Sequence, residues 1–248
     1  MDHFRVLEIA DFLREPRDKA LRFLKSIASA TPANPDVSFR DKIEEYFGNR
    51  QIISIYESCA THSTEVRKSL VRDTILLLRK HCPNPAQIAV YGSGIGEEAI
   101  LLKRACPDWV IHCYDLKESY SIKFARFRAQ RVGAQLEFIE VDSPAPFVST
   151  YHAVISFEDL QHCFDAEAVL ASLRGALKNH GKLLCTERFF SPGYTFPETP
   201  QLDDESRFET WMLEQGFHLV ERHDCGPNLQ RDKYLYVFRK SDGVPSQP

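Results

Sequence analysis

Hydrophobic and polar residues alternate along the middle of the chain in two different patterns. Short continuous apolar runs, each long enough for one buried strand, are separated by segments in which apolar residues recur every three or four positions. The predicted strands are 87–92, 109–115, 135–141, 151–157 and 181–187, and the predicted helices are 96–106, 118–132 and 165–179. This alternation predicts a parallel sheet that is covered by helices on both faces.

The N-terminal third has helical patterns only. One predicted helix starts at Pro16, and two more span 39–47 and 51–60. A fourth begins after a cap at Ser63 or Thr64. The prolines of 82–85 then mark a predicted domain boundary. We expect residues 1–82 to form a helical cap, which either covers a sheet edge or closes over a substrate as a lid.

The C-terminal part also differs from a simple repeat. A loop at 189–200 is rich in proline and aromatic residues, and a predicted helix follows at 203–214. The apolar runs 216–220 and 234–238 have the spacing of a hairpin. We therefore predict a sheet domain over 83–240 and a disordered tail over 241–248.

Three glycines on alternate positions follow the first predicted strand. Gly92, Gly94 and Gly96 have no Cβ, so they can adopt positive φ and let a ligand lie against the backbone. The free N–H groups at the start of the next helix point toward the same place. This arrangement indicates a nucleotide-binding loop at the carboxyl edge of the sheet, where open α/β sheets bind their ligands.

The residues around the glycines distinguish between classes of nucleotide. A dinucleotide loop needs a small residue where this chain has Glu97, and Glu98 follows, so two carboxylates would face a pyrophosphate. No Gly-Lys-Ser/Thr follows the turn, which excludes a Walker loop. S-adenosylmethionine carries a sulfonium cation and no phosphates, so it is the predicted cofactor.

Composition and charge reduce the number of possible functions further. The 31 basic and 35 acidic side chains give a net charge of −4, which provides no general attraction to nucleic acid or to an anionic membrane. The seven cysteines are scattered without a Cys-x-x-Cys pair, so we expect reduced thiols and no metal site. Neither a membrane span nor a secretory signal is evident, so we expect a cytoplasmic enzyme without a membrane partner.

From residue 87 to 240 the chain resembles the class I S-adenosylmethionine-dependent methyltransferases of the small-molecule type. Five pieces match in order: the glycine loop 92–96, the ribose-binding acid Asp115, the adenine-side loop 141–143, the segment 156–165 after the fourth strand and the fifth strand at 181–185. One position departs from the family's pattern. The family commonly has an acid two positions before the first glycine, where this chain has Val90.

The resemblance implies a Rossmann-like, doubly wound α/β fold with a mostly parallel sheet. It also implies that 216–220 and 234–238 form an antiparallel C-terminal edge. The cofactor-binding residues that it implies are Gly92, Ser93, Gly94, Gly96, Asp115, Leu116, Asp142, Ser143, Phe157 and Glu158.

The predicted activity is transfer of the methyl group to a small-molecule acceptor, with oxygen favoured over nitrogen or carbon. His162 follows the fourth strand and is the predicted general base, because an ordinary histidine pKa near 6.5 suits it to accept a proton from a hydroxyl. The aromatic loop is predicted to close over an apolar acceptor pocket; the alternative is a satellite core under the N-terminal helices. Its aromatic residues are Phe189, Phe190, Tyr194 and Phe196.

Three other functions stay open from the sequence alone. Valine at position 90 is compatible with a non-catalytic methyltransferase-like subunit. A nucleic-acid methyltransferase is disfavoured, because Ser156-Phe-Glu-Asp stands where an Asn/Asp-Pro-Pro-aromatic tetrad would follow the fourth strand. A nicotinamide oxidoreductase is disfavoured by Glu97. The sequence does not specify the oligomeric state or the identity of the acceptor.

Overall fold

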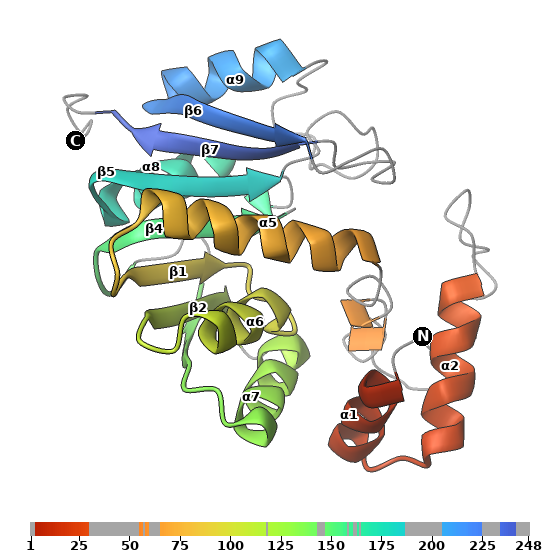
Figure 1. The fold of residues 1–248 in the computed structure, drawn as a ribbon. Helices are drawn as coiled ribbons and strands as arrows, with labels where there is room; N and C mark the ends of the chain where they lie inside the picture. The colour runs from red at the N-terminus through yellow and green to blue at the C-terminus, as the bar shows by residue number, and fades with distance from the viewer. Residues whose placement is uncertain are drawn as a thin grey trace.

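The structure is a computed structural model. It describes residues 3–29, 55–56, 58–59, 65–117, 119–142, 147–157, 159–160, 163, 165–186, 205–224 and 234–241. Within these residues a seven-stranded sheet forms the centre of the molecule, in the order β3-β2-β1-β4-β5-β7-β6 (Figure 1). Its strands are β1 (Gln87–Tyr91), β2 (Val110–Leu116), β3 (Glu137–Val141), β4 (Tyr151–Phe157), β5 (Leu177–Thr186), β6 (Phe217–Asp224) and β7 (Tyr234–Lys240).

The pairing of the strands confirms the predicted mostly parallel sheet with an antiparallel edge. Strands β1 to β5 pair in parallel, and β7 runs antiparallel to both β5 and β6. Strand β1 pairs with β2 on one side and with β4 on the other, so the order of connection reverses between β1 and β4. Ligands of open α/β sheets bind in the crevice at such a switch point.

Helices cover both faces of this sheet. The helices of the sheet region are α5 (Glu65–His81), α6 (Glu97–Ala105), α7 (Tyr120–Val132), α8 (Ala166–Ala176) and α9 (Glu205–Glu214). Successive residues of β1 point to opposite faces: Val90 packs in the cluster with α5 and α6, whereas Tyr91 packs in the cluster with α8 and α9. A strand buried on both faces must be apolar throughout, which explains the continuous apolar runs.

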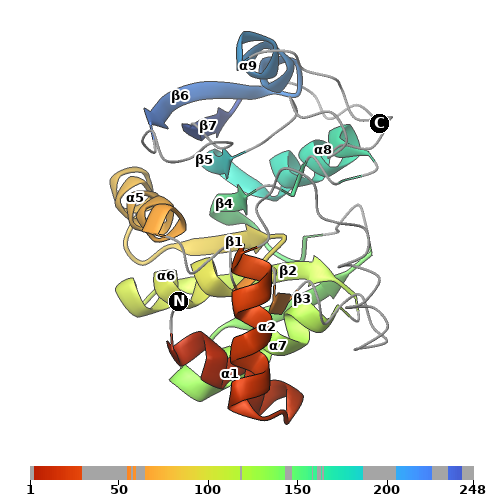
Figure 2. The same ribbon diagram turned by 90° about the vertical axis from the view of Figure 1, so that its right-hand side faces the viewer.

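The N-terminal helices pack against the glycine loop. Helices α1 (His3–Leu13) and α2 (Arg17–Ser29) lie near α7, on the side toward which the parallel strands point (Figures 1 and 2). Ile9 of α1 and Leu24 of α2 share one buried cluster with Ile95 of the glycine loop and Phe124 of α7. The first two helices are therefore attached to the carboxyl side of the sheet through an apolar core.

The boundary between α8 and β5 differs clearly from the sequence prediction. Helix α8 ends at Ala176 and β5 begins at Leu177, whereas the helical pattern predicts a helix to 179 and a strand from 181. Leu177 already pairs with Tyr151, and after a register irregularity Lys182 pairs with Ala153. Long-range strand pairing thus ends the helix earlier than its local pattern indicates. Helix α1 is an addition to the helices that the sequence pattern predicts.

Some predicted elements lie outside the described residues. They are the helix 39–47, the loop 189–200 and the tail from 242. Of the predicted helix 51–60, residues 55–56 and 58–59 are helical. No helix in the described ranges is both long and apolar enough to cross a membrane.

Candidate functional site

The glycine loop connects the end of β1 to the start of α6 at the switch point. Gly92, Gly94 and Gly96 have φ values of 67°, 50° and 74°, a left-handed conformation that a residue with a Cβ adopts only under strain. The Ser93 N–H donates to the Tyr114 carbonyl of β2 at 2.9 Å, and the Gly96 N–H donates to the Ser93 carbonyl at 2.8 Å. These bonds hold the loop against the carboxyl end of β2 and direct the chain into α6.

The Ser93 side chain is an unsatisfied polar group within this loop. Ser93 is 2% exposed, and its hydroxyl oxygen has no hydrogen-bond partner in the part of the chain that the structure describes. A buried hydroxyl without a partner costs roughly 1–3 kcal/mol. A polar ligand that reaches the loop would satisfy this group, so the loop fits a bound nucleoside or amino-acid moiety.

Asp115, at the end of β2, faces the loop with its carboxylate. The Gly94 N–H donates to Oδ2 at 2.6 Å, and the Leu116 N–H donates to Oδ1 at 2.7 Å. Burial raises the pKa of Asp115 above its ordinary value, although bonds from Leu116, Gly94 and Ser119 act in the opposite direction. A carboxylate has about four acceptor sites, so these three donors leave one open for a further hydroxyl donor.

The two glutamates of the first α6 turn are turned toward arginines. Glu97 accepts from Arg128 at 2.6 Å, and Glu98 accepts from Arg67 at 3.0 Å. Both carboxylates also interact favourably with the positive end of the α6 dipole. The acidic character of the loop is thus partly neutralised by cations of α5 and α7.

Arg128 of α7 joins three segments that are distant in the sequence. Its guanidinium donates to Glu8 of α1 at 3.0 Å, to the Ile95 carbonyl at 2.7 Å and to Glu97 at 2.6 Å. The side chains of Arg128, Glu8 and Glu97 are 4%, 1% and 9% exposed. Sequence reasoning missed this cluster, because Glu8 and Arg128 are separated by 120 residues and no local pattern links them.

Asp159 is a second residue that sequence reasoning did not select. A Cβ added to Gly92 would lie 1.9 Å from both Cγ and Oδ2 of Asp159, so the carboxylate lies directly against the Gly92 backbone. Only glycine leaves room for this approach. The predicted neighbour Glu158 lies outside the described residues, as do Ser143 and the predicted base His162.

The other predicted site residues have different environments. Leu116 is 59% exposed beside Asp115, where its side chain is available to an apolar ligand surface. Asp142 follows β3, is exposed, and lies 4.0 Å from Lys117. The Phe157 ring is buried in the core on the α5 side, with the Arg67 guanidinium 5.3 Å from its centre. The structure thus brings together the glycines, Ser93, Asp115 and Leu116, while the Phe157 ring belongs to the core.

Comparison with protein families identifies the region that holds this loop. Residues 90–185 match the family described as "Methyltransferase domain". The match begins on β1, ends on β5, and includes the glycine loop, Asp115 and Asp142. This stretch is a class I methyltransferase domain. Domains of this family use S-adenosylmethionine, so the predicted enzyme class and the predicted cofactor are confirmed.

Solved methyltransferase structures share the fold of the chain. The magnesium protoporphyrin IX methyltransferase from Synechocystis PCC 6803, with S-adenosylmethionine bound, is 18% identical over 83% of this chain and 92% of its own, with a TM-score of 0.56. The O-methyltransferase segment of StiE is 14% identical over 82% of both chains, with a TM-score of 0.55. The N-methyltransferase NodS from Bradyrhizobium japonicum WM9 is 14% identical over 73% and 99%, with a TM-score of 0.56. No curated protein sequence matches at a significant level.

Val90 has a structural role in this methyltransferase domain. It is 3% exposed and packs with the core residues of α5 and α6, at the position where the family commonly has an acid. Glu97 and Glu158 are the nearby acids that the sequence offers as a compensating charge. Glu97 accepts a hydrogen bond from Arg128, and Asp159 places a carboxylate at the Gly92 end of the loop.

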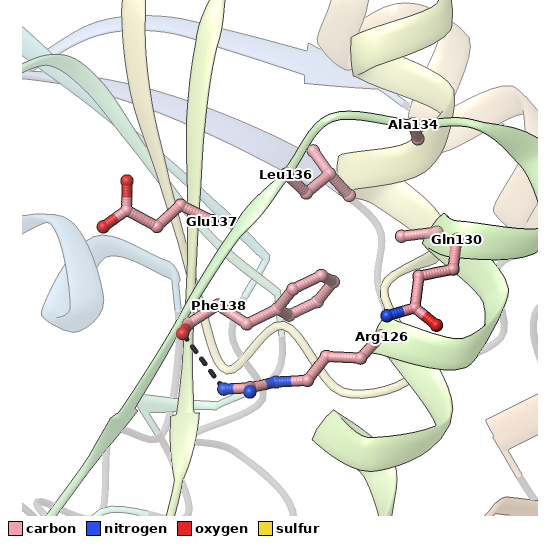
Figure 3. A pocket seen from close by; sticks show the side chains of 7 residues that line it. Arg126, Gln130, Ala134, Leu136, Glu137 and Phe138 are labelled. Atoms are coloured by element: carbon pink, nitrogen blue, oxygen red, sulfur yellow. Dashed lines mark hydrogen bonds between the residues drawn. The ribbon is translucent and has the colours of Figure 1, made fainter.

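A surface cavity of the methyltransferase lies away from the glycine loop. It has a volume of about 320 Å³ and lies between α7 and β3, with Arg126, Gln130 and Phe138 in its lining (Figure 3). The Arg126 guanidinium donates to the Phe138 carbonyl at 3.1 Å and pairs with Glu140 at 2.9 Å. The cation of this cavity is thus already paired, which makes the glycine loop the better candidate site. The described residues contain no group of three or more His, Cys, Asp or Glu side chains that could hold a metal ion.

Proposed function

We propose that this enzyme transfers the methyl group of S-adenosylmethionine to an oxygen atom of a small-molecule acceptor. The observation that supports the cofactor site best is the glycine loop at the switch point, with the buried Ser93 hydroxyl and the Asp115 carboxylate beside it. Among the similar structures are both O- and N-methyltransferases, so nitrogen is the second candidate acceptor atom.

The proposed cofactor site divides between a nucleoside side and a methionine side. On the nucleoside side, Asp115 accepts a hydrogen bond from a ribose hydroxyl, Leu116 packs on the adenine, and Asp142 and Ser143 form the adjoining loop. On the methionine side are Gly92, Ser93, Gly94 and Gly96, together with Phe157 and Glu158. Phe157 contributes through its backbone, because its ring is buried in the core.

In this reaction the main role of the protein is to position the reactants. The sulfonium of the cofactor supplies an activated methyl group. The chain holds the acceptor in line with it and excludes water, which accounts for much of the rate enhancement in reactions of this kind. We propose His162 as the group that removes the proton of an acceptor hydroxyl.

A small acceptor is supported by what covers the carboxyl side of the sheet. Helices α1 and α2 share a buried core with Ile95, so they lie close to the glycine loop. A folded macromolecule would need a more open edge, whereas a small molecule enters an enclosed pocket. We propose that the aromatic loop at 189–200 completes this pocket.

Replacing Asp115 with asparagine tests the nucleoside side. The substitution exchanges an acceptor oxygen for a donor, so we expect the affinity for S-adenosylmethionine to fall roughly tenfold to hundredfold, as for a lost hydrogen bond to a charged group. Because burial raises the pKa of Asp115, the carboxylate is lost at a higher pH than an ordinary aspartate. Wild-type affinity should therefore weaken as the pH falls through this raised value, and the variant should respond less. Equal affinities in calorimetry would remove Asp115 from the site.

Methyl transfer itself is tested with labelled cofactor and His162→Gln. The enzyme is incubated with methyl-tritiated S-adenosylmethionine and panels of phenols, carboxylic acids and amines. We expect label on phenolic or carboxylic oxygen, and we expect the variant to lose turnover while its cofactor affinity is unchanged. Wild-type turnover should also fall as the pH is lowered and a histidine base becomes protonated. Labelling of amines alone would make nitrogen the acceptor, and labelling of protein or nucleic acid alone would refute the small-molecule proposal.

A further inference from the structure

A relay of hydrogen bonds links residues of β2, β3 and β4 and of the connection between β3 and β4. The Val148 N–H donates to the Tyr114 hydroxyl at 3.1 Å, and the hydroxyls of Tyr114 and Tyr151 lie 2.6 Å apart. The Tyr151 hydroxyl lies 2.8 Å from Nδ1 of His112, whose Nε2 lies 3.2 Å from the Glu137 carboxylate. Both tyrosines are fully buried, whereas the Glu137 side chain is 63% exposed. The relay therefore runs from the surface into the core.

Among the described residues, one arrangement of protons satisfies every donor of this relay. The Tyr114 oxygen accepts from Val148, and its other partner is Tyr151, so the Tyr114 O–H donates to Tyr151. The Tyr151 O–H then donates to Nδ1 of His112. Burial raises the pKa of Tyr151, so this hydroxyl stays protonated. Because Nδ1 is an acceptor, the ring proton of neutral His112 lies on Nε2 and is donated to Glu137.

A second proton on the His112 ring is incompatible with this arrangement. Histidine ordinarily gains its second ring proton in mildly acidic solution. Nδ1 would then donate to Tyr151, and the Tyr151 O–H would turn to the Tyr114 oxygen. The Tyr114 O–H would have no acceptor left in the part of the chain that the structure describes. A buried donor without a partner is unfavourable, so Tyr114 would have to move and its bond from Val148 would break.

The described groups that face His112 act in opposite directions on this protonation. Glu137 of β3 is the charged group, and its carboxylate favours the imidazolium. Tyr151 of β4 and Tyr114 of the same strand are the titratable neighbours, and the direction of their bonds favours the neutral ring. On β1 the paired residue is Ala89, which brings no charge. The protonation of His112 is therefore decided within the relay.

The buried end of the relay holds the connection between β3 and β4. Phe147 precedes Val148 in this connection and packs against the Tyr114 ring, with the two ring centroids 4.6 Å apart. The backbone carbonyl of Tyr114 accepts from the Ser93 N–H of the glycine loop at 2.9 Å, and Asp115 follows Tyr114 in β2. The same tyrosine thus anchors the connection through its side chain and the glycine loop through its backbone.

We propose that the relay from Glu137 to Val148 is a pH-sensitive latch. It holds the connection between β3 and β4 on β2 while His112 is neutral, and it releases the connection when His112 takes up a second ring proton. One proton near the surface thereby changes how a segment is anchored to the strand that also holds the glycine loop. The latch does not require a bound cofactor.

NMR of the isotope-labelled wild type tests the latch in two steps. The imidazole nitrogen shifts of His112, assigned by their loss in His112→Asn, report which ring nitrogen carries the proton, and we expect Nε2 at neutral pH. Exchange of the Val148 amide with solvent is then followed from about pH 8 to about pH 5, relative to an amide in the middle of β4. We expect this relative exchange to accelerate about tenfold, as for one lost hydrogen bond, while His112 gains its proton.

Three variants separate the latch from a general change in stability. Glu137→Gln removes the charge that favours the imidazolium, so release should need a lower pH. Glu140→Gln removes the same charge from the same strand, but Glu140 pairs with Arg126, so release should occur as in the wild type. Tyr151→Phe interrupts the relay, so the Val148 exchange should no longer respond to His112.

Three results would contradict the latch. A ring proton on Nδ1 at neutral pH would show that the hydrogen bonds run in the other direction. Constant Val148 exchange while His112 gains its proton, or an unchanged pH response in Tyr151→Phe, would show that the two ends are not coupled. Because the Glu137 side chain is exposed, Glu137→Gln should fold even if Tyr151→Phe does not, and the same response in Glu137→Gln and Glu140→Gln would also contradict the latch.

Discussion

Replacing Arg128 with alanine is expected to lower the free energy of unfolding by about 3–5 kcal/mol, the usual cost of breaking a buried ion pair. The guanidinium donates hydrogen bonds to the Glu8 carboxylate, the Glu97 carboxylate and the Ile95 carbonyl at the same time. Its removal leaves two buried carboxylates without this cation. Lysine should not restore the loss, because an ammonium cannot reproduce the planar fork of donors.

The measurement is urea unfolding of the protein without cofactor, with Arg131→Ala as the matched control. Arg131 lies one turn further along α7 and also pairs with α1, through Asp11, but this pair is 33% and 40% exposed. A surface pair of this kind contributes about 0–1 kcal/mol. If Arg128→Ala costs no more than Arg131→Ala, the buried cluster does not hold α1 to the glycine loop.

Replacing Gly92 with alanine is expected to weaken cofactor binding about a hundredfold, or about 2.7 kcal/mol. The new Cβ would lie 1.9 Å from the Asp159 carboxylate, and the φ of 67° adds strain of roughly 1–2 kcal/mol for a residue with a side chain. Either Asp159 or the loop must move. Both lie at the proposed methionine end of the site.

Gly133→Ala separates the steric effect from the backbone strain. Gly133 ends α7 with nearly the same φ of 68°, but a Cβ there would meet nothing within 4 Å. We expect this control to lose some stability and no cofactor affinity in calorimetry. Binding by Gly92→Ala within a factor of three of the wild type would contradict the assigned loop geometry.

The sheet is largely predictable because its strands are buried on both faces. A strand such as β4 has to be continuously apolar, and the sequence pattern locates it at the residues that the structure assigns. The start of β5 is not predictable in the same way. Pairing between Leu177 and Tyr151 determines it, and such long-range pairing leaves no signal in the local pattern.

The residues of the candidate site also differ in how far the sequence alone predicts them. The glycines and Asp115 belong to short motifs at strand ends, so the sequence alone is enough to locate them. Glu8, Arg128 and Asp159 act through contacts with residues far away in the chain, and their local surroundings resemble those of ordinary surface charges. Buried charge pairs and close backbone approaches depend on tertiary packing, which only the fold specifies. The role of His162 stays a prediction, because it lies outside the described residues.

The glycine loop is expected to bind S-adenosylmethionine at the switch point between β1 and β4. Isothermal titration calorimetry of the purified wild-type chain with S-adenosylmethionine, S-adenosylhomocysteine and NAD tests it most directly. We expect both adenosyl compounds to bind one per chain, each more tightly than NAD. Tighter binding of NAD, or no binding of either adenosyl compound at millimolar concentration, would show that the loop is not an S-adenosylmethionine site.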